Sequence, residues 1–578
     1  MNPAQLLAHF DRISEAPDAV PDLRRFIFDL AVRGKLVEQD PRDEPASKLL
    51  QRIDAEKVLL VKQGKIRKQE LLEDIDESDI PFELPAGWVW SRLGNIGDWG
   101  SGSTPPRGTS EYYGGETTWL KSGELGDRLA LKGSEERVTA VALQKCSFRL
   151  NQPGDVLIAM YGATIGKLAI LAEPAVTNQA VCGCTPFAGI LNRYLFTYLL
   201  SRRADFHAQS EGGAQPNISK IKIVLSPFAL PPLAEQQRIV AKVDELMALC
   251  DRLEAAQAER ESRRDRLVAS SLNRFNNGAV ADAFRNHARF YFNHLPRLTT
   301  RSEHIQQLRK TILNLAVRGQ LVPQDPNDEP ASELLKRIEM EKSRLVKEGT
   351  LARQKLASSE PKELAFDCPM NWQAVNFNDV CNLVTSGSRG WAEFYSDTGP
   401  KFIRAQNIRF GRLRLKDLAC VSLPKKAEGT RTQVSKGDLL IVITGAGVTN
   451  PALLDHELGE AYVSQHVALI KPTATSLSRW LLLCLMAPVG ARAELVERAY
   501  GAGKPGLNLD NIRFLRIPFP PLAEQQRIVA KVEELMALCD RLERQLTTTQ
   551  TESRRLLDAV LHEALSAPCG LNQEVVQL

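Results

Sequence analysis

The sequence predicts an α+β protein in which two mixed α/β domains are separated by long helices forming an antiparallel coiled coil, with an internal pseudo-twofold repeat. The segment PPLAEQQRIVAKVDELMALCDRLE at residues 231–254 returns at 520–543 with one change, Asp244 to Glu533. Residues 30–53 return at 315–338 with five changes. The first offset, 289 residues, is half of the 578-residue chain. Duplication therefore accounts for the whole length of the chain.

The amino-terminal region is predicted to consist of helices. Apolar side chains recur at helical spacing from Leu23 to Val32, and Gly34 stands where that helix should end. A polar loop follows, and Pro45 suits the first turn of a second, charged helix. The same text returns in the middle of the chain, so we expect the same pair of helices there.

Two stretches have the composition of strands and turns. Glycines and short apolar runs dominate both, and GDVLIAMYGA at residues 154–163 aligns with GDLLIVITGA at 437–446. We therefore expect two domains that share a fold and differ in surface. The predicted regions are N-terminal helices (1–83), a first mixed domain (84–229), a central helical repeat region (230–367), a second mixed domain (368–519) and a C-terminal coiled-coil helix (520–578).

Both copies of the longer repeat carry apolar residues in alternating steps of four and three, which is the pattern of a heptad seam. Two such helices can lie along each other with their seams buried, and a helix packed on its own domain is the alternative. Both copies keep the seam while the intervening sequences diverge, which favours pairing. The seam residues are Ile239, Val243, Leu246, Cys250 and Leu253 in the first copy and Ile528, Val532, Leu535, Cys539 and Leu542 in the second.

Composition narrows the class of protein. A formal net charge of +4 is too small for a protein that coats nucleic acid by charge alone, so any such binding must be local. The ten cysteines lack paired spacing, which fits a reducing cytoplasm. The amino end lacks the order of a signal peptide, and the apolar run from Trp480 to Val489 is too short to cross a bilayer. We expect a cytoplasmic protein with no membrane partner.

Motifs for catalysis or cofactor binding are missing from the sequence. The Pro-Pro pairs at 105, 231 and 520 do not follow Asn or Asp, as an adenine methyltransferase loop requires. GATIGKL at residues 162–168 has the wrong spacing for a phosphate-binding loop and reads better as a connection from strand to turn. The eight histidines form no metal-binding pattern. We expect no catalytic residues, no cofactor and no metal.

A basic segment in the second mixed domain has the residue types that read DNA. Between Arg404 and Lys416, RAQNIRFGRLRLK carries five basic residues and no acidic one. Arg412, Arg414 and Lys416 alternate, which on one strand places them on one face to follow phosphates. Arg404, Gln406 and Asn407 have side chains that make bidentate contacts with guanine or adenine. An ordinary solvated strand is the alternative for each residue.

Other polar residues near turns and strand ends complete the DNA-binding candidates. Both mixed domains lean basic: residues 85–228 have 14 basic and 11 acidic residues, and residues 370–519 have 18 and 12. Trp88 and Trp119 are expected in the core rather than stacked on bases. The candidates are Ser103, Thr104, Arg107, Lys121, Tyr161, Asn178 and Gln179 in the first domain, with Ser388, Arg389, Thr444, Gln465, His466 and Lys504 as rough counterparts in the second.

These motifs, taken in order, resemble the specificity subunit of type I restriction-modification enzymes. The resemblance covers essentially the whole chain and rests on LAVRGKLVEQDPRDEPASKLLQRI, PPLAEQQRIVAKV, Gly87-Trp88 through Gly102-Ser-Thr-Pro, and GDVLIAMYGATIG followed by Thr177-Asn-Gln-Ala. It implies two target-recognition domains that read a bipartite double-stranded DNA target. It also implies a bacterial or archaeal host-defence system in which the helices hold two methyltransferase subunits, to which restriction subunits are added. The chain would then have no catalysis of its own.

Three alternatives remain open from the sequence. A specificity subunit of a methylation-only system differs in its partners rather than in this chain. A coiled-coil scaffold that binds proteins alone has little reason to vary two equivalent domains. A stand-alone DNA methyltransferase lacks its motifs here, and methyl transfer by the purified chain would identify one.

Overall fold

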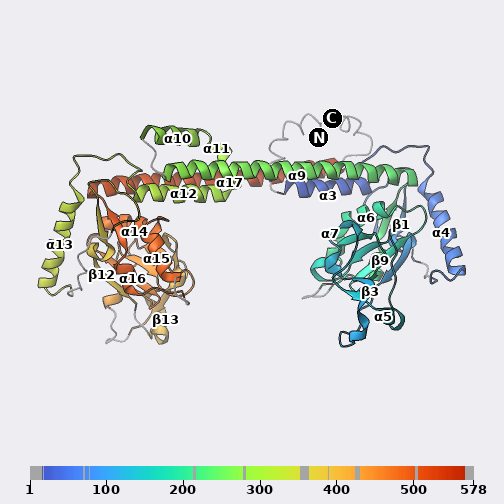
Figure 1. The fold of residues 1–578 in the computed structure, drawn as a ribbon, viewed down its shortest axis with the longest axis horizontal. Coiled ribbons are helices and arrows are strands. Elements are labelled where there is room, and N and C mark those ends of the chain that lie inside the picture. The colour runs from blue at the N-terminus through green and yellow to red at the C-terminus, as the bar shows by residue number, and fades with distance from the viewer. Residues whose placement is uncertain are drawn as a thin grey trace. The chain divides into compact units, whose positions relative to one another are not determined.

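The computed structural model describes residue 16 and residues 18–68, 72–73, 75–76, 79–211, 216–276, 281–351, 363–387, 390–423, 430–500 and 505–566. It divides into two compact units (Figure 1). Unit 1 comprises residues 1–260 and 549–578, and unit 2 comprises residues 261–548. Each unit therefore contains one mixed domain, and we call these domain 1 (from β1 to β10) and domain 2 (from β11 to β21).

Two long helices each contribute to both units. Helix α9 (Leu233–Asn276) begins in unit 1, and α17 (Leu522–Ser566) begins in unit 2. Both start directly after a Pro-Pro pair, as the sequence predicts, because a missing N–H costs nothing in a first helical turn. Each unit also has a shorter pair of helices: α3 (Ala19–Val32) and α4 (Ala46–Lys62) in unit 1, α12 (Ser302–Val317) and α13 (Ala331–Lys347) in unit 2.

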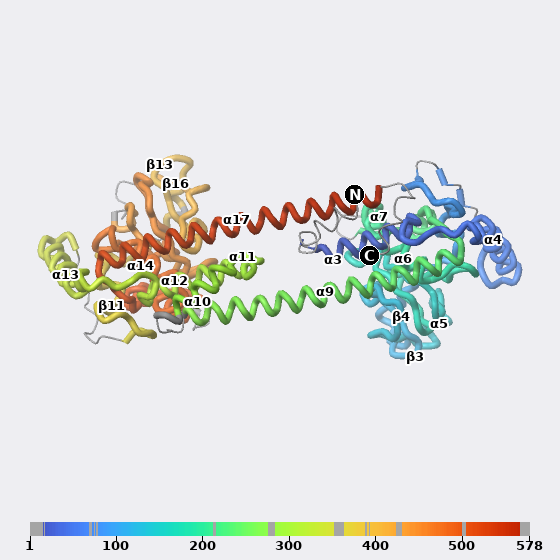
Figure 2. The backbone as a smooth tube through the Cα atoms, turned by 90° about the horizontal axis from the view of Figure 1, so that it is seen from above, coloured from blue at the N-terminus to red at the C-terminus, as the bar shows by residue number. Residues whose placement is uncertain are grey.

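In unit 1, α3 lies between α9 and the end of α17 (Figure 2). Arg24 of α3 binds Asp251 and Glu254 of α9 at 2.7 and 2.9 Å. On the other side of α3, Asp22 forms an ion pair with Arg554 of α17 at 2.9 Å. The short helix thus joins the two long ones through charged groups on opposite flanks.

These contacts also fix the directions of the helices in unit 1. The loop that follows α3 reaches back toward the start of α9, where Arg238 binds Asp43 at 2.7 Å, so α3 runs antiparallel to α9. Beyond the end of α3, Lys35 donates to the carbonyl of Leu565 at 2.6 Å, so α3 runs parallel to α17. Helices α9 and α17 are therefore antiparallel within this unit, as predicted.

The described residues of domain 1 form three sheets and four short helices. A five-stranded sheet has the order β2-β9-β6-β7-β4, and a three-stranded sheet has the order β5-β3-β8. Strands β1 and β10 pair antiparallel and close the domain next to α9. The strands are β1 (Val89–Arg92), β2 (Gly97–Ser101), β3 (Tyr113–Leu120), β4 (Arg128–Leu131), β5 (Arg137–Val138), β6 (Val156–Ala159), β7 (Leu168–Leu171), β8 (Val176–Thr177), β9 (Val181–Pro186) and β10 (Pro227–Leu230); the helices are α5 (Ala140–Lys145), α6 (Asn192–Ser201), α7 (Arg203–Ala208) and α8 (Lys220–Leu225).

Domain 2 repeats this framework. Its four-stranded sheet has the order β12-β20-β17-β18, its three-stranded sheet has the order β16-β13-β19, and β11 pairs with β21. An added hairpin, β14–β15, has no counterpart among the strands described for domain 1. The strands are β11 (Gln373–Asn376), β12 (Cys381–Ser386), β13 (Tyr395–Ile403), β14 (Ile408–Arg409), β15 (Arg412–Leu413), β16 (Ala419–Val421), β17 (Leu439–Val442), β18 (Pro451–Leu453), β19 (Ala461–Val463), β20 (Val467–Pro472) and β21 (Arg516–Phe519); the helices of unit 2 also include α10 (Ala281–Asn293), α11 (Leu295–Leu298), α14 (Ser478–Met486), α15 (Ala491–Tyr500) and α16 (Leu509–Arg513).

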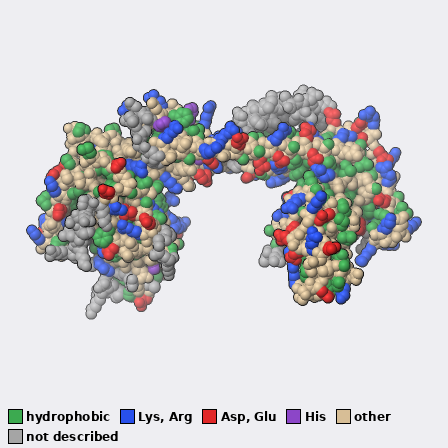
Figure 3. All heavy atoms as spheres, viewed as in Figure 1, with side chains coloured by type: hydrophobic (Ala, Val, Ile, Leu, Met, Phe, Trp, Pro, Cys, Tyr) green, Lys and Arg blue, Asp and Glu red, His purple; other side chains and the backbone are tan. Residues whose placement is uncertain are grey.

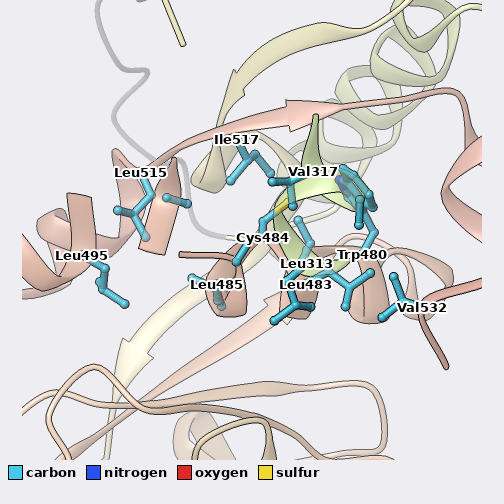
Figure 4. Close-up of a cluster of buried hydrophobic side chains, with 14 of the residues drawn as sticks. Leu313, Val317, Trp480, Leu483, Cys484, Leu485, Leu495, Leu515, Ile517 and Val532 are labelled. Atoms are coloured by element: carbon cyan, nitrogen blue, oxygen red, sulfur yellow. The ribbon is translucent and has the colours of Figure 1, made fainter. Parts of the chain in front are cut away.

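The core of unit 2 joins its domain to its helices (Figure 4). Trp480 and Leu483 of α14 lie beside Leu313 of α12, Ile517 of β21 and Val532 of α17. Trp480 is fully buried and its indole N–H donates to the carbonyl of Pro518 at 3.0 Å. Domain and helices therefore share one apolar core within the unit, which fixes the domain on its helical frame.

The long helix that begins in each unit, α9 or α17, also carries a buried carboxylate, and both carboxylates have equivalent hydrogen-bond donors. Glu235 accepts hydrogen bonds from Trp88 at 2.8 Å and from Gln39 at 3.1 Å. Its counterpart Glu524 accepts from Trp372 at 3.0 Å and from Gln324 at 2.6 Å. Burial raises the pKa of both carboxyls. The glutamate of the repeated AEQQ motif therefore has a structural role, because it binds a tryptophan and a glutamine in both units.

The one substitution within the longer repeat preserves its interaction. Asp244 pairs with Arg193 of α6, and Glu533 pairs with Arg479 of α14. The two arginines occupy equivalent helices of the two domains, so each frame binds its own domain through the same ion pair. Among the residues that the structure describes, no helix is long and apolar enough to cross a membrane.

Candidate nucleic-acid interface

Four loops of domain 1 converge at the ends of its strands. The loops after β2, β3 and β6 meet the segment between β8 and β9 through backbone hydrogen bonds. Ser103 N–H donates to the carbonyl of Thr177 at 2.9 Å, and Asn178 N–H donates to the carbonyl of Leu120 at 2.9 Å. Met160 N–H donates to the carbonyl of Ala180 at 2.8 Å. The sequence candidates Ser103, Lys121, Tyr161, Asn178 and Gln179 are thereby brought together.

Domain 2 closes the equivalent loops with equivalent bonds. Ser464 N–H donates to the carbonyl of Ile403 at 2.9 Å, and Ile443 N–H donates to the carbonyl of His466 at 3.0 Å. Gly387 N–H donates to Val467 at 3.2 Å, as Gly102 N–H donates to Val181 at 3.0 Å in domain 1. This register equates Lys121 with Arg404, Tyr161 with Thr444, Gln179 with Gln465 and Ala180 with His466. The frameworks match while most of these side chains differ.

Two cations of domain 1 share one carboxylate. Arg107 Nη1 lies 2.7 Å from Glu136 Oε2, and Lys121 binds the other oxygen of the same carboxylate. The hydrogen bonds from Arg107 and Lys121 lower the pKa of Glu136, so it stays ionised near neutral pH. Arg107, Lys121 and Glu136 together therefore carry two positive charges and one negative charge on a half-exposed surface.

Aromatic rings set the positions of these cations. The Arg107 guanidinium lies 5.1 Å from the centre of the Tyr113 ring and 5.3 Å from that of Trp119. Trp119 is buried, as predicted, and its indole N–H donates to the carbonyl of Ser103 at 3.1 Å. Cation–π attraction therefore adds to the ion pair in holding Arg107 over the strand end.

Domain 2 presents a polar cluster at the corresponding place. Thr444 Oγ1 lies 2.5 Å from His466 Nδ1, and Gln465 Nε2 lies 3.3 Å from His466 Nε2. Gln465 and His466 are exposed. A hydroxyl, an imidazole and an amide side by side offer both donors and acceptors to a base edge.

Arg404 and Asn407 have different roles in the structure. The Arg404 guanidinium lies 5.7 Å from the centre of the Tyr395 ring and remains partly exposed. Asn407 is buried, and its Oδ1 accepts from the backbone N–H of Arg404 at 3.0 Å. The prediction that Asn407 contacts a base is therefore wrong, because its side chain caps the turn that presents Arg404.

The prediction of one basic strand face is also wrong in its geometry. Strand β15 contains two residues, Arg412 and Leu413, and the chain then turns, so Lys416 lies outside the strand. Arg414 pairs with Asp417 at 3.3 Å. The hairpin packs against α14 and α17, and Arg412 lines a cavity of about 380 Å³ between them. In the sequence, the alternating arginines after Gly411 look like one face of a long strand. In the structure, Gly411 has a φ of 77° and forms a tight turn, which keeps the strand short.

The remaining candidates divide by position. Thr104 and Gln406 are exposed beside the converging loops. The predicted residues Ser388, Arg389 and Lys504 lie outside the described residues. Of the seam residues, Ile239, Val243 and Cys250 are buried in a cluster with α3 and domain 1, and Ile528, Val532 and Cys539 are buried with α12 and domain 2. The prediction that the two seams pair with each other is therefore wrong, because each seam buries its apolar side chains against its own unit, as the alternative held. Leu246, Leu253, Leu535 and Leu542 are partly buried against the same clusters.

Sequence reasoning missed three residues of the site. Glu136 holds both cations of domain 1, and Tyr113 and Tyr395 lie under Arg107 and Arg404. A signal for the tyrosines was present, because Glu-aromatic-Tyr occurs at residues 111–113 and again at 393–395, at the start of β3 and of β13. Glu136 had no such signal, since its contact depends on the register of β3 and β5.

Charge on the displayed face of domain 1 is mixed rather than of one sign (Figure 3). Blue basic and red acidic side chains alternate over the domain, in agreement with its small excess of basic residues. Binding of a polyanion by domain 1 would depend on local groups such as Arg107 and Lys121. Within the described ranges, no group of three or more His, Cys, Asp or Glu residues is placed to hold a metal ion.

Comparison with known proteins gives consistent matches over the chain. The family model "Type I restriction modification DNA specificity domain" matches residues 85–260 and 369–549. The specificity subunit of the type I restriction enzyme EcoAI of Escherichia coli is 32% identical over 565 residues, covering 95% of this chain and 94% of that protein. The EcoEI specificity subunit of Escherichia coli is 29% identical over 598 residues, with the same coverage. A chain from a solved structure concerned with complex assembly and conformational transition of the type I R-M system covers 84% of this chain and 99% of its own, at 18% identity and a TM-score of 0.47.

Proposed function

The chain belongs to the type I restriction-modification DNA specificity family, and from this premise we propose that it reads a bipartite double-stranded DNA target through its two domains. It further holds two methyltransferase subunits, and restriction subunits join through them. The chain itself supplies recognition and assembly rather than catalysis. The methylation-only variant of this role uses the same chain surfaces with different partners.

One observation supports the proposal that domains 1 and 2 each recognise their own part of the DNA target. Both domains bring equivalent loops together with equivalent backbone hydrogen bonds, yet Lys121 is replaced by Arg404, Tyr161 by Thr444 and Ala180 by His466. A common framework with different side chains at its converging loops is what two different half-sites require. A single continuous target would give no reason for the framework to be kept twice.

The chemistry of the loops fits base reading combined with phosphate contact. Amide, hydroxyl and imidazole groups of Gln465, Thr444 and His466 can donate to and accept from base edges in the major groove. Arg107, Lys121 and Arg404 supply positive charge beside them, which positions a duplex through its phosphates. Gln179 and Gln465 occupy equivalent exposed positions, and a glutamine suits the N6 and N7 atoms of adenine.

The long helices support the proposal of two identical partners. Residues on the outer face of α9 are exposed and identical to exposed residues of α17. Among them, Glu245 and Glu534 pair with lysines of their own helices, Lys242 and Lys531, and the contacts between described residues include no such partner for the others. Outer residues of α4 and α13 have instead diverged, as at Val58 and Ser343 or at Leu59 and Arg344. Identity is thus kept where one kind of partner would bind twice. The matched residues are Ala234, Gln237, Ala241, Glu245 and Ala248 in α9 and Ala523, Gln526, Ala530, Glu534 and Ala537 in α17.

Methylation mapping tests the proposed function. The chain is co-expressed with its methyltransferase subunit, and the methylated motif is read by single-molecule sequencing of the DNA. We expect two short specified blocks around a fixed unspecified gap, absent from cells that lack this chain. Unchanged methylation without the chain, or one continuous motif, would contradict the proposal. Methyl transfer by the purified chain alone would contradict its non-catalytic role.

A further inference from the structure

The carboxylate of Glu136 pairs with two cations at the converging loops of domain 1, Arg107 and Lys121. Arg107 Nη1 lies 2.7 Å from Oε2, whereas Oε1 accepts from Lys121 Nζ and also from Arg107 Nη2 at 3.4 Å. The side chains of Lys121 and Glu136 are 30% and 28% exposed, so the pair is accessible to a ligand yet partly shielded from water. In the free protein these two cations are therefore already bound to an internal anion.

The surrounding contacts hold this arrangement in place. Arg107 lies over Tyr113 and Trp119, and the ammonium of Lys121 lies 5.9 Å from the Trp119 ring centre. The carbonyl of Glu136 accepts the backbone N–H of Trp119 at 3.1 Å, which fixes the carboxylate next to the ring. A phosphate can reach the cations only by competing with a carboxylate that the sheet register positions.

Domain 2 lacks the carboxylate at the equivalent position. Thr118 pairs with Arg137 in domain 1 and Lys401 pairs with Cys420 in domain 2, so the next register step equates Glu136 with Ala419. Arg404, the counterpart of Lys121, lies over Tyr395 with no acidic side chain at that step. Trp391 stacks on Phe402 at 5.5 Å, where domain 1 has Arg107 over Trp119.

We propose that Glu136 is an internal competitor for DNA phosphate, which keeps the affinity of domain 1 for DNA of any sequence low. This inference rests on the proposed DNA-reading function and deepens it. Domain 2, which has Ala419 in place of the carboxylate at the equivalent register step, would supply more of the sequence-independent attraction. Domain 1 would then bind firmly only where contacts to its own bases add to the phosphate contacts.

The salt dependence of binding reports this role directly. Each phosphate contact made by a cation releases counterions and adds about 0.9 to the slope of log affinity against log salt. Replacing Glu136 by Gln keeps the size of the side chain and frees Arg107 and Lys121 for phosphates. We expect E136Q to steepen the slope by roughly one to two units on a duplex of arbitrary sequence, and to raise the affinity about threefold to tenfold at low salt.

A matched control separates this role from a simple change of net charge. Glu111 lies in the same domain and pairs with Lys145 at 3.8 Å, and its carboxylate has no ion pair with Arg107 or Lys121 among the described contacts. E111Q changes the net charge by the same amount and should leave the slope within about 0.3 units of the wild type, because it frees no cation at the loops. Thermal unfolding of both full-length variants verifies that they are folded.

The mirror variant tests the same idea in domain 2. Ala419→Glu places a carboxylate at the register step where domain 1 has Glu136, within reach of the neighbourhood of Arg404. We expect a shallower slope, by about one unit, and weaker binding to arbitrary duplex DNA. The two substitutions therefore move the same quantity in opposite directions.

Each result decides the inference. Equal slopes for E136Q and E111Q, or a loss of affinity in folded E136Q, would overturn it and leave the DNA-reading function standing. A change in unfolding temperature without a change in slope would make Glu136 a structural ion pair only. Failure of the wild-type full-length chain to bind any duplex would instead contradict the proposed function, and the inference with it.

Discussion

At the scale of residues, the duplication separates contacts that are the same in both units from groups that differ between domains 1 and 2. Trp88 with Glu235 and Trp372 with Glu524 form the same buried hydrogen bond in both units. At the converging loops the equivalent positions hold different groups, such as Tyr161 and Thr444. A contact kept twice supports folding, whereas a position varied within a kept framework is free to set specificity.

The buried carboxylate of Glu235 predicts a dependence of stability on pH. Burial raises its folded pKa above the ordinary value of 4.5, so the folded state binds this proton more tightly than the unfolded state does. The favourable contribution is complete below the unfolded pKa and is lost as the pH rises through the folded pKa. E235Q removes this titrating carboxyl group. The NH2 group of the glutamine cannot accept a hydrogen bond, so one of the two donors, Trp88 or Gln39, loses its acceptor. This loss costs about 1–3 kcal/mol at acidic pH.

The measurement is denaturant unfolding of wild type and E235Q at a series of pH values from about 4 to about 7. The free energy of unfolding of E235Q should be lower than that of the wild type at acidic pH, and this difference should become smaller as the pH rises. E245Q, on the exposed face of the same helix, serves as the control and should run parallel to the wild type. A difference for E235Q that is constant or widens with pH would refute the assignment of the buried carboxylate.

At the scale of elements, α9 has one face that is buried in unit 1 and one face that is exposed, and we expect the two faces to have different roles. Ile239 is fully buried with α3 and domain 1, while Leu249 is 43% exposed on the outside. I239A should cost about 2–5 kcal/mol of unfolding free energy in unit 1, because it leaves a cavity in a packed core. L249A should change that quantity little and should instead weaken binding of the methyltransferase subunit.

Unfolding and co-purification with the partner measure these two effects separately. A folded L249A chain that retained the full amount of partner would argue against the outer face as the binding surface. An I239A chain as stable as the wild type would contradict the packing of the seam onto its own unit.

The end of α17 is a second element with a specific role in unit 1. Arg554 pairs with Asp22 of α3, and Leu557 and Val560 are buried. Deleting residues 549–578 should therefore destabilise unit 1 by roughly 3–6 kcal/mol, the value of two buried aliphatic side chains. Limited proteolysis of unit 1 measures the loss, and deletion of residues 567–578 alone is the matched control. Equal protection of the two truncated chains would show that α17 does not support this unit.

At the scale of the whole molecule, the sequence predicts the architecture better than it predicts the site. The duplicated segments place the long helices and their Pro-Pro starts, and Gly34 ends α3 as predicted, at φ 65°. Periodicity and turn residues also distinguish the two mixed domains from the helices. These features are local in sequence, so residue order alone carries them.

The side chains of the site depend on tertiary contacts and were harder to predict. Asn407 reads as a base-contacting residue until its burial and its bond to the Arg404 backbone are known. Arg412 reads as part of a phosphate-binding stripe, yet its hairpin packs on α14 and α17. Glu136 meets Lys121 through the pairing of β3 and β5, which contains an irregular register that no sequence pattern announces.

The central claim is that two separate readers share one duplicated frame, and replacement of one reader tests it most directly. In the full-length chain, residues 89–230 of domain 1 are replaced by residues 373–519 of domain 2, and the methylated motif is mapped by single-molecule sequencing. We predict that one block of the motif is kept and that the other block changes to a second copy of the kept one in inverted orientation, as the pseudo-twofold repeat requires. A motif in which both blocks change, or in which neither does, from a folded and methylating complex would contradict two independent readers.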